Sequence, residues 1–269
     1  MSLRLLGQIL SIFAVFVCTF GSAFAEGDNN GCVVSASVKK AEVSMAFEIS
    51  SAAKNRAKLS QKTLNEARRL AQQCDGGIAY ILGLVFVRGT VVDKNLDEGK
   101  RWFAQASHAG VIPARFELAK MYVYGKKLPE SKEGIDMLKR LSKRMGAASY
   151  ALAYFYQKGI SVNKNLKLAE QYYVKSYAEG YKPGSYGLAL LYFDEEKYSE
   201  SYPYFERSLK DEGRPGALFY LGLMDVYGIR GKAKVAAGYL NIEKACEFKY
   251  AKACDFVKKN KDVYKGPEH

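Results

Sequence analysis

Residues 150–180 read YALAYFYQKGISVNKNLKLAEQYYVKSYAEG. Aromatic residues lie three positions before and three positions after the small residue Ala153, and Gly159 follows six positions after it. The second half of the stretch has small and aromatic residues at helical spacing and also closes on glycine. Because glycine readily adopts the left-handed conformation that ends a helix, the stretch predicts two helices joined by a loop.

The same pattern occurs five times along the chain. We number each copy from its small residue, position 0, which leucine always precedes; position −3 is aromatic in every copy. These predicted core residues are Tyr80, Leu82 and Gly83; Phe116, Leu118 and Ala119; Tyr150, Leu152 and Ala153; Tyr186, Leu188 and Ala189; and Phe219, Leu221 and Gly222. Position +3 is aromatic except at Asp225, and position +6 is glycine except at Glu195. Position 0 recurs every 33 to 36 residues, a period typical of helical-hairpin repeats.

The column spacing predicts a helix that is buried on two faces. Positions −5, −1 and +3 fall on one face, while position −3 points to nearly the opposite side. In a stack of hairpins, the first helix contacts both its own partner and the next repeat. The small residue at position 0 allows two helices to approach closely.

The loops inside the first and third copies also match, over 89–96 and 159–166. Asp93 and Asn163 occupy the same place in the two loops. Asp and Asn side chains accept hydrogen bonds from nearby backbone N–H groups in turns and at helix starts. We therefore expect Asp93 and Asn163 to form a turn or to cap the helix that follows.

The combined pattern A-x-x-x-L-G-x-x-Y-x-x-G, V-x-[DN], A-x-x-[WY]-[WFY] and a closing glycine resembles the Sel-one-like repeat (SLR), a relative of the tetratricopeptide repeats. The resemblance covers about residues 75–260 and implies an all-α fold, an αα-hairpin solenoid wound as a right-handed superhelix. We expect an N-terminal helical cap over 26–74, five repeats over 75–249, and a C-terminal capping helix and tail over 250–269. The expected repeats are 75–110, 111–146, 147–180, 181–213 and 214–249.

Residues 1–25 have the layout of a secretory signal peptide. Arg4 precedes an apolar run of about 16 residues, shorter than the roughly 20 that a membrane span needs. Ala23-Phe24-Ala25 then supplies a small-x-small cleavage pattern. We expect cleavage near Ala25 and a periplasmic or secreted chain without an integral membrane span; the alternative is an uncleaved anchor.

Four cysteines follow the signal sequence, an even number that favours disulfides in an exported chain. The spacing of Cys246 and Cys254 does not fit a zinc site. The stretch KACEFKYAKAC resembles the cysteine-rich secreted branch of the SLR family, whose repeats carry such pairs as disulfides. This resemblance implies a bond between Cys246 and Cys254, which leaves Cys32 to pair with Cys74.

Lys and Arg exceed Asp and Glu by 13, and the sequence pI is about 9.3. This charge favours acidic partners such as anionic glycans, lipid head groups or acidic protein faces. An exported chain is not expected to bind nucleic acid. The densest basic group is Lys139, Arg140, Lys143 and Arg144, which we expect on one stripe of a helix. The stripe is either a solvated face or a contact for an anionic envelope component.

Most of the 20 tyrosines fall in the repeat columns and are interpreted first as packing residues. Tyr154, Tyr181, Tyr198 and Tyr220 lie outside the columns that define the repeat. Because tyrosine is amphipathic, these four are candidates for a ligand-binding groove of the solenoid.

The sequence contains no recognisable catalytic or phosphate-binding motif, and its only internal histidine is His108. We expect no enzyme activity, no cofactor and no metal. The SLR resemblance implies an envelope scaffold that binds a protein or peptide on its concave face, in signalling, complex assembly or host contact. One alternative is a penicillin-binding or weak β-lactamase-like protein, for which Ser51 and Lys54 match S-x-x-K in spacing alone. The other is a structural component of an envelope machine.

Overall fold

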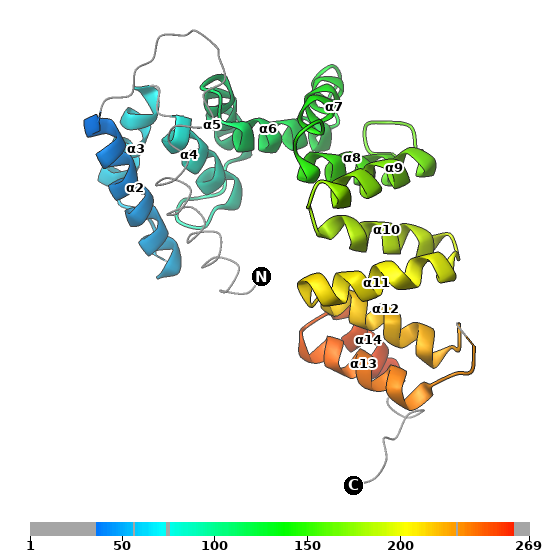
Figure 1. Cartoon of the computed structure of the whole chain (residues 1–269). Helices are drawn as coiled ribbons and strands as arrows, with labels where there is room; N and C mark the ends of the chain where they lie inside the picture. The colour runs from blue at the N-terminus through cyan, green and yellow to red at the C-terminus, as the bar shows by residue number, and fades with distance from the viewer. Residues whose placement is uncertain (1–35, 56, 74–75, 230, 261–269) are drawn as a thin grey trace. The chain divides into compact units, whose positions relative to one another are not determined.

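The computed structural model describes residues 36–55, 57–73, 76–229 and 231–260. Its regular structure is α-helical throughout, with no strand in those ranges (Figure 1). The helices are α2 (Ala36–Lys54), α3 (Gln61–Gln72), α4 (Gly76–Arg88), α5 (Leu96–His108), α6 (Ile112–Gly125), α7 (Glu130–Leu141), α8 (Gly146–Lys158), α9 (Leu166–Ala178), α10 (Pro183–Asp194), α11 (Tyr198–Glu212), α12 (Pro215–Val226), α13 (Val235–Glu247) and α14 (Ala251–Lys259). The prediction of an all-α repeat fold is confirmed. The predicted signal peptide lies outside the described residues.

The chain divides into two compact units, Met1–Met137 and Leu138–His269, and the division falls inside α7. In unit 1, α4 packs against α5, and α3 and α6 flank that pair. In unit 2, the pairs α8–α9, α10–α11 and α12–α13 are hairpins, and α9–α10 and α11–α12 contacts join one hairpin to the next. A first helix therefore contacts its own partner and a neighbouring repeat, as expected for a solenoid.

Position 0 marks the closest approach of the two helices in a hairpin. A Cβ atom added to Gly222 would lie 2.6 Å from the carbonyl oxygen of Gly238, and one added to Gly238 would lie 2.5 Å from that of Gly222. A Cβ atom on Gly134 would likewise lie 2.6 Å from the carbonyl oxygen of Ala119. The two helices of the first repeat also approach closely where Gly99 faces Gly83. In the fourth repeat, the Ser201 hydroxyl donates a hydrogen bond to the Ala189 carbonyl at 2.9 Å.

In the first, third and fourth repeats, the aromatic residue at position −3 packs on an aromatic ring of the second helix. The ring centroids lie 5.8 Å apart for Tyr80 and Phe103, 5.4 Å for Tyr150 and Tyr173, and 5.9 Å for Tyr186 and Phe205. Phe103, Tyr173 and Phe205 are themselves buried. The leucine and aromatic columns thus make one continuous core within each hairpin.

Glycine at position +6 ends the first helix in two repeats. Gly89 and Gly159 have φ values of 64° and 66°, in the left-handed region that side chains disfavour. In the second repeat, α6 continues through Gly125, and Lys126 adopts the left-handed conformation instead, with φ of 55°. Gly125 is thus the last residue of the helix, and the left-handed residue lies one position later than expected.

The second helix is capped by asparagine in the first and third repeats. The side chains of Asn95 and Asn165 accept hydrogen bonds from backbone N–H groups three residues later, at 3.0 and 2.9 Å. The caps therefore lie two positions after Asp93 and Asn163, so of the two roles expected for these residues the cap is wrong; both residues lie in the loop that precedes the helix. Asp93 instead pairs with the Lys58 ammonium at 2.6 Å.

Candidate functional site

A row of aromatic and arginine side chains connects the repeats of unit 2. The residue at position −3 of each repeat contacts the residue that lies just before the next first helix. Ring centroids are 5.5 Å apart for Tyr150 and Tyr181, and the Arg214 guanidinium lies 5.0 Å from the Tyr186 centroid. The Phe219 and Tyr250 centroids are also 5.5 Å apart. We call this row, Tyr150, Tyr181, Tyr186, Arg214, Phe219 and Tyr250, the aromatic ladder.

The ladder lies at the N-terminal ends of consecutive first helices. Tyr181 comes two residues before α10, while Arg214 and Tyr250 are the N-cap residues of α12 and α14. None of these three helix starts has a side-chain cap hydrogen bond. The residues at these starts are therefore not used as caps, and their side chains extend onto the preceding repeat.

The ladder is polar at its edge although its rings are packed. Except for Phe219, its members are neither fully buried nor fully exposed. Tyr186 and Tyr250 place their hydroxyl oxygens 3.4 Å apart, and Arg214 donates from Nε to Glu212 at 2.6 Å. Burial raises the pKa values of Tyr150, Tyr181 and Tyr186, so their hydroxyls keep their protons at neutral pH. The face thus offers hydroxyl donors and one guanidinium.

The tyrosines considered for a groove occupy different environments. Tyr181 is a ladder member, whereas Tyr220 is 7% exposed and stacks on Phe205 at 5.0 Å. The Tyr220 hydroxyl still accepts a hydrogen bond from the Lys252 ammonium at 2.8 Å. Tyr198 packs edge-on against Phe193, and Tyr154 is half-buried. Of the four candidate tyrosines, Tyr181 belongs to the aromatic ladder and the other three do not.

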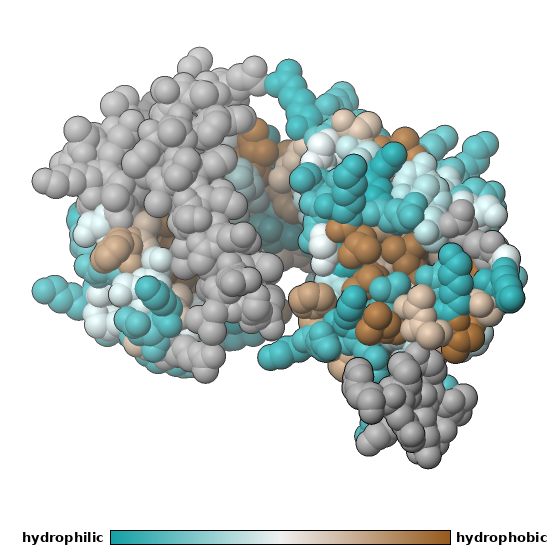
Figure 2. Space-filling view, turned by 60° about the horizontal axis from the view of Figure 1, so that its bottom comes forward, coloured by the Kyte–Doolittle hydropathy of each residue, from teal (hydrophilic) through white to brown (hydrophobic). Residues whose placement is uncertain are grey.

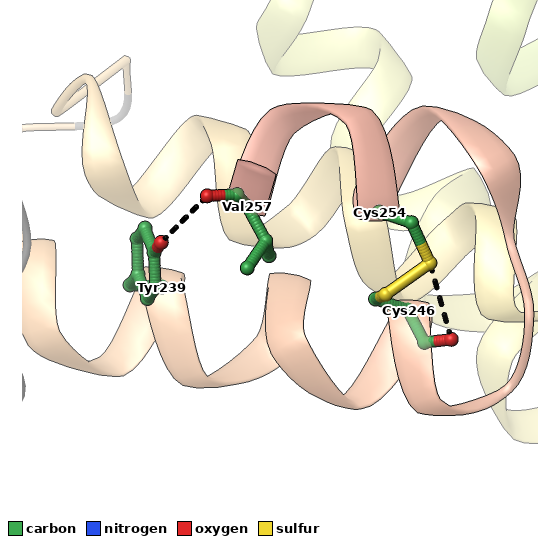
Figure 3. The surroundings of a disulfide bond; sticks show 4 residues. All are labelled: Tyr239, Cys246, Cys254 and Val257. Carbon is green, nitrogen blue, oxygen red and sulfur yellow. Dashed lines mark hydrogen bonds between the residues drawn. A yellow bond between two sulfur atoms is a disulfide. The ribbon is translucent and has the colours of Figure 1, made fainter. Parts of the chain in front are cut away.

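A disulfide joins the last two helices. Cys246 in α13 and Cys254 in α14 are bonded, with Cα atoms 4.6 Å apart (Figure 3). Figure 3 also shows the Tyr239 hydroxyl donating to the Val257 carbonyl, about one helical turn further along α14; the two oxygens are 3.4 Å apart. These two connections hold adjacent turns of α14 against α13. Cys32 and Cys74 lie outside the described residues, so their pairing remains a prediction.

The basic group does not form a single helical stripe. Lys139 and Arg140 lie in the last turn of α7, but this helix ends at Leu141. Lys143 and Arg144 therefore lie in the turn that follows, and the expectation of one helical stripe is wrong for these two. All four side chains are exposed.

Hydrophobic side chains gather at the end of unit 2 where α12, α13 and α14 lie. That end faces the viewer in Figure 2, which shows brown hydrophobic residues among polar ones. Leu240 and Val235 of α13 are 50% and 47% exposed, and Phe248, just after α13, is 66% exposed.

The described residues hold no group of three His, Cys, Asp or Glu side chains suited to a metal ion. No described helix has both the length and the apolar character to cross a membrane. Ser51 and Lys54, the S-x-x-K pair of the penicillin-binding alternative, lie in the last turn of α2, and the Lys54 side chain is exposed.

Comparisons with known proteins identify the fold. No protein-family model matches the chain, and no curated protein matches it either. A Sel1 repeat protein from Oxalobacter formigenes superposes with a TM-score of 0.57 at 20% identity, over 69% of this chain and 78% of the other. A protective antigen of uropathogenic Escherichia coli with an SLR fold gives a TM-score of 0.59 at 23% identity, over 71% of this chain and only 42% of the antigen. The chain therefore has the SLR fold that the repeat columns predicted.

Proposed function

We propose that the chain is an exported, non-catalytic repeat scaffold, periplasmic or secreted, that binds a protein partner at the bacterial envelope. The observation that carries this proposal is the aromatic ladder. The ladder is a face of tyrosines packed edge-on or tilted, with one phenylalanine and one arginine, repeated at the start of successive helices. Tyrosine and arginine are the residue types that most often dominate binding energy in protein interfaces.

The ladder is suited to binding because little ordering is needed before a partner docks. Neighbouring rings already fix one another, so their side-chain entropy is largely lost on folding rather than on binding. The hydroxyls of Tyr150 and Tyr181 and the guanidinium of Arg214 can donate hydrogen bonds to carbonyl or carboxylate groups. We infer that the partner presents an extended or acidic segment to this face. We also propose the four exposed basic residues, Lys139, Arg140, Lys143 and Arg144, as a second contact for an anionic envelope component.

The test is capture of partners from the cell envelope by the tagged chain, with cross-linking and mass spectrometry. The ladder variant Tyr181→Ser with Arg214→Ser should lose the dominant partner. The matched control is Tyr227→Ser with Lys210→Ser, which also removes one tyrosine and one cation, both exposed and outside the ladder.

Equal recovery of the partner by the ladder variant and the control would contradict the proposed binding face. Circular dichroism should first show that both variants keep the helical content of the parent. A partner that remains with the scaffold in a large sedimenting complex would favour a structural role in an envelope machine.

A further inference from the structure

The loop inside the second repeat exposes an apolar side chain that the equivalent loop of the first repeat buries. Position +9 is Val92 in the first repeat and Leu128 in the second. Val92 is 8% exposed, whereas Leu128 is 82% exposed. Val162, at the same position in the third repeat, is half-buried. The second repeat therefore presents to solvent an apolar residue at a position that the first repeat buries in the hairpin core.

The backbone explains this difference. In the first repeat, the Asn95 N–H donates to the carbonyl of Phe86 at 2.9 Å, which ties the loop back onto the first helix. The second repeat has Pro129 shortly before α7, and its loop is held differently: the Ser131 N–H donates to the carbonyl of Lys127 at 2.8 Å. The loop is thus folded onto the start of α7, and Leu128 is left outside the hairpin.

The side chains around Leu128 are basic and amphipathic. Lys126 and Lys127 precede it and are exposed, and Tyr124 at the end of α6 is 55% exposed. The nearest acidic residue in the sequence, Glu130, accepts a hydrogen bond from Lys100 at 2.6 Å. We call the segment 124–129 the basic tip. It presents one apolar side chain, one tyrosine and two ammonium groups at one end of a hairpin.

We propose that the basic tip docks the protein on an anionic lipid surface. Leu128 enters the boundary of the acyl chains, Lys126 and Lys127 contact lipid phosphates, and Tyr124 lies at the level of the head groups. A bilayer presents this arrangement of groups in the same order, with anionic charge above hydrocarbon and an interface that tyrosine prefers. A protein groove for one leucine has no need of two flanking cations. The net excess of 13 basic residues acts in the same direction.

The two lysines and the leucine should each make a modest contribution to membrane binding, and the contributions can be measured separately. A lysine near an anionic membrane surface strengthens binding about fivefold, so removing two lysines should weaken binding by about 25-fold. Loss of the buried part of a leucine side chain should weaken it by about tenfold. Salt should weaken the lysine contribution, because surface charges are screened within about 10 Å at moderate ionic strength.

The test is co-sedimentation with vesicles of phosphatidylethanolamine and phosphatidylglycerol, compared with vesicles of phosphatidylcholine alone. The variants are Lys126→Gln with Lys127→Gln, and Leu128→Ser. Their controls are Lys164→Gln with Lys167→Gln, which changes the net charge equally at exposed sites, and Val174→Ser on the exposed face of α9. The parent and Val174→Ser should bind anionic vesicles equally well. The lysine control should lose only the binding that the lower net charge removes. Both tip variants should bind much more weakly than their controls.

A fluorescence measurement separates insertion from simple charge attraction. In a Leu128→Trp variant, tryptophan emission should shift to shorter wavelength on anionic vesicles, while the buried Trp102 of the parent should show no such shift. Failure of the parent to bind anionic vesicles would overturn the proposal. So would equal binding losses in the tip variants and their controls. If Leu128→Ser binds vesicles normally but loses a protein partner, the tip docks into a protein and the lipid proposal is wrong.

Discussion

Replacing Gly222 by alanine should destabilise the last hairpin, although alanine is the better helix former. The added methyl group would lie 2.6 Å from the carbonyl oxygen of Gly238 and 2.8 Å from Cγ1 of Ile242. The first of these atoms is backbone, so it can move away only if α12 and α13 separate. Overpacking of this kind costs about 1–3 kcal/mol, and a backbone obstacle favours the upper end.

The helix propensity of alanine opposes this cost. Gly→Ala inside a helix gains about 1 kcal/mol, so the free energy of unfolding should fall by about 2 kcal/mol at Gly222. Gly125 is the matched control, because it is also helical and a Cβ atom there would meet nothing within 4 Å. Gly125→Ala should raise the free energy of unfolding by up to about 1 kcal/mol.

Urea unfolding, followed by far-ultraviolet circular dichroism, measures both variants. The Gly222→Ala midpoint should move down and the Gly125→Ala midpoint should stay or move up. A Gly222→Ala protein at least as stable as the parent would refute the argument that position 0 is glycine because two backbones meet there.

Three further predictions concern other contacts. Replacing Cys246 and Cys254 by serine should lower the free energy of unfolding by about 2–3 kcal/mol, because the bond closes a short loop in the unfolded chain; urea unfolding of the oxidised parent and the variant measures it. Asn165→Ala should lower stability by about 1 kcal/mol through loss of the N-cap, whereas Asn163→Ala should leave the thermal midpoint unchanged. Burial raises the pKa of Tyr80 to about 12. Since the unfolded value is about 10, the folded state holds the proton more tightly; this stability is complete below pH 10 and is lost as the pH rises towards 12. A Tyr80→Phe variant should therefore lose less stability than the parent between these pH values, and an equal loss would contradict the assignment.

The repeat columns could be predicted because close packing allows few alternatives at those positions. Position 0 faces a backbone carbonyl of the partner helix in the fifth repeat and the Phe103 ring in the first, so only a small residue fits, and the leucine before it is buried in the first repeat as in the third. In the first, third and fourth repeats, position −3 packs on an aromatic ring of the second helix, as Tyr80 does on Phe103. Such constraints act within one hairpin and leave a periodic signal in the sequence.

The aromatic ladder left a weaker signal. Its second member lies eight positions before position 0, where the chain has Val111, Met145, Tyr181 and Arg214 in successive repeats. Methyl, thioether, phenol and guanidinium groups can all cover a ring, so stacking between repeats does not select one residue type. Aligning this column would have shown where the repeats meet but not which residues form a polar face.

Helix ends and loop exposure were also difficult to predict. Lys143 and Arg144 continue the helical spacing of Lys139 and Arg140, and no glycine or proline marks the end of α7 at Leu141. The exposure of Leu128 depends on which carbonyl groups accept hydrogen bonds from the loop N–H groups. Loop hydrogen bonds of this kind leave no periodic pattern in the sequence. Sequence patterns report packing within a hairpin more faithfully than they report the paths between helices.

The aromatic ladder makes the repeats of unit 2 exchangeable. Each of these joints packs an aromatic ring of one repeat against an aromatic or planar group of the next, and the pairs Tyr150–Tyr181 and Tyr186–Arg214 do so with different chemistry. Excision of residues 181–213 would bring Arg214 to the place of Tyr181, opposite Tyr150, and would replace one permitted joint by another. Gene segments that encode one repeat can therefore be lost or duplicated without a new interface. The number of repeats, and with it the length of the helical stack, can change in a single genetic event.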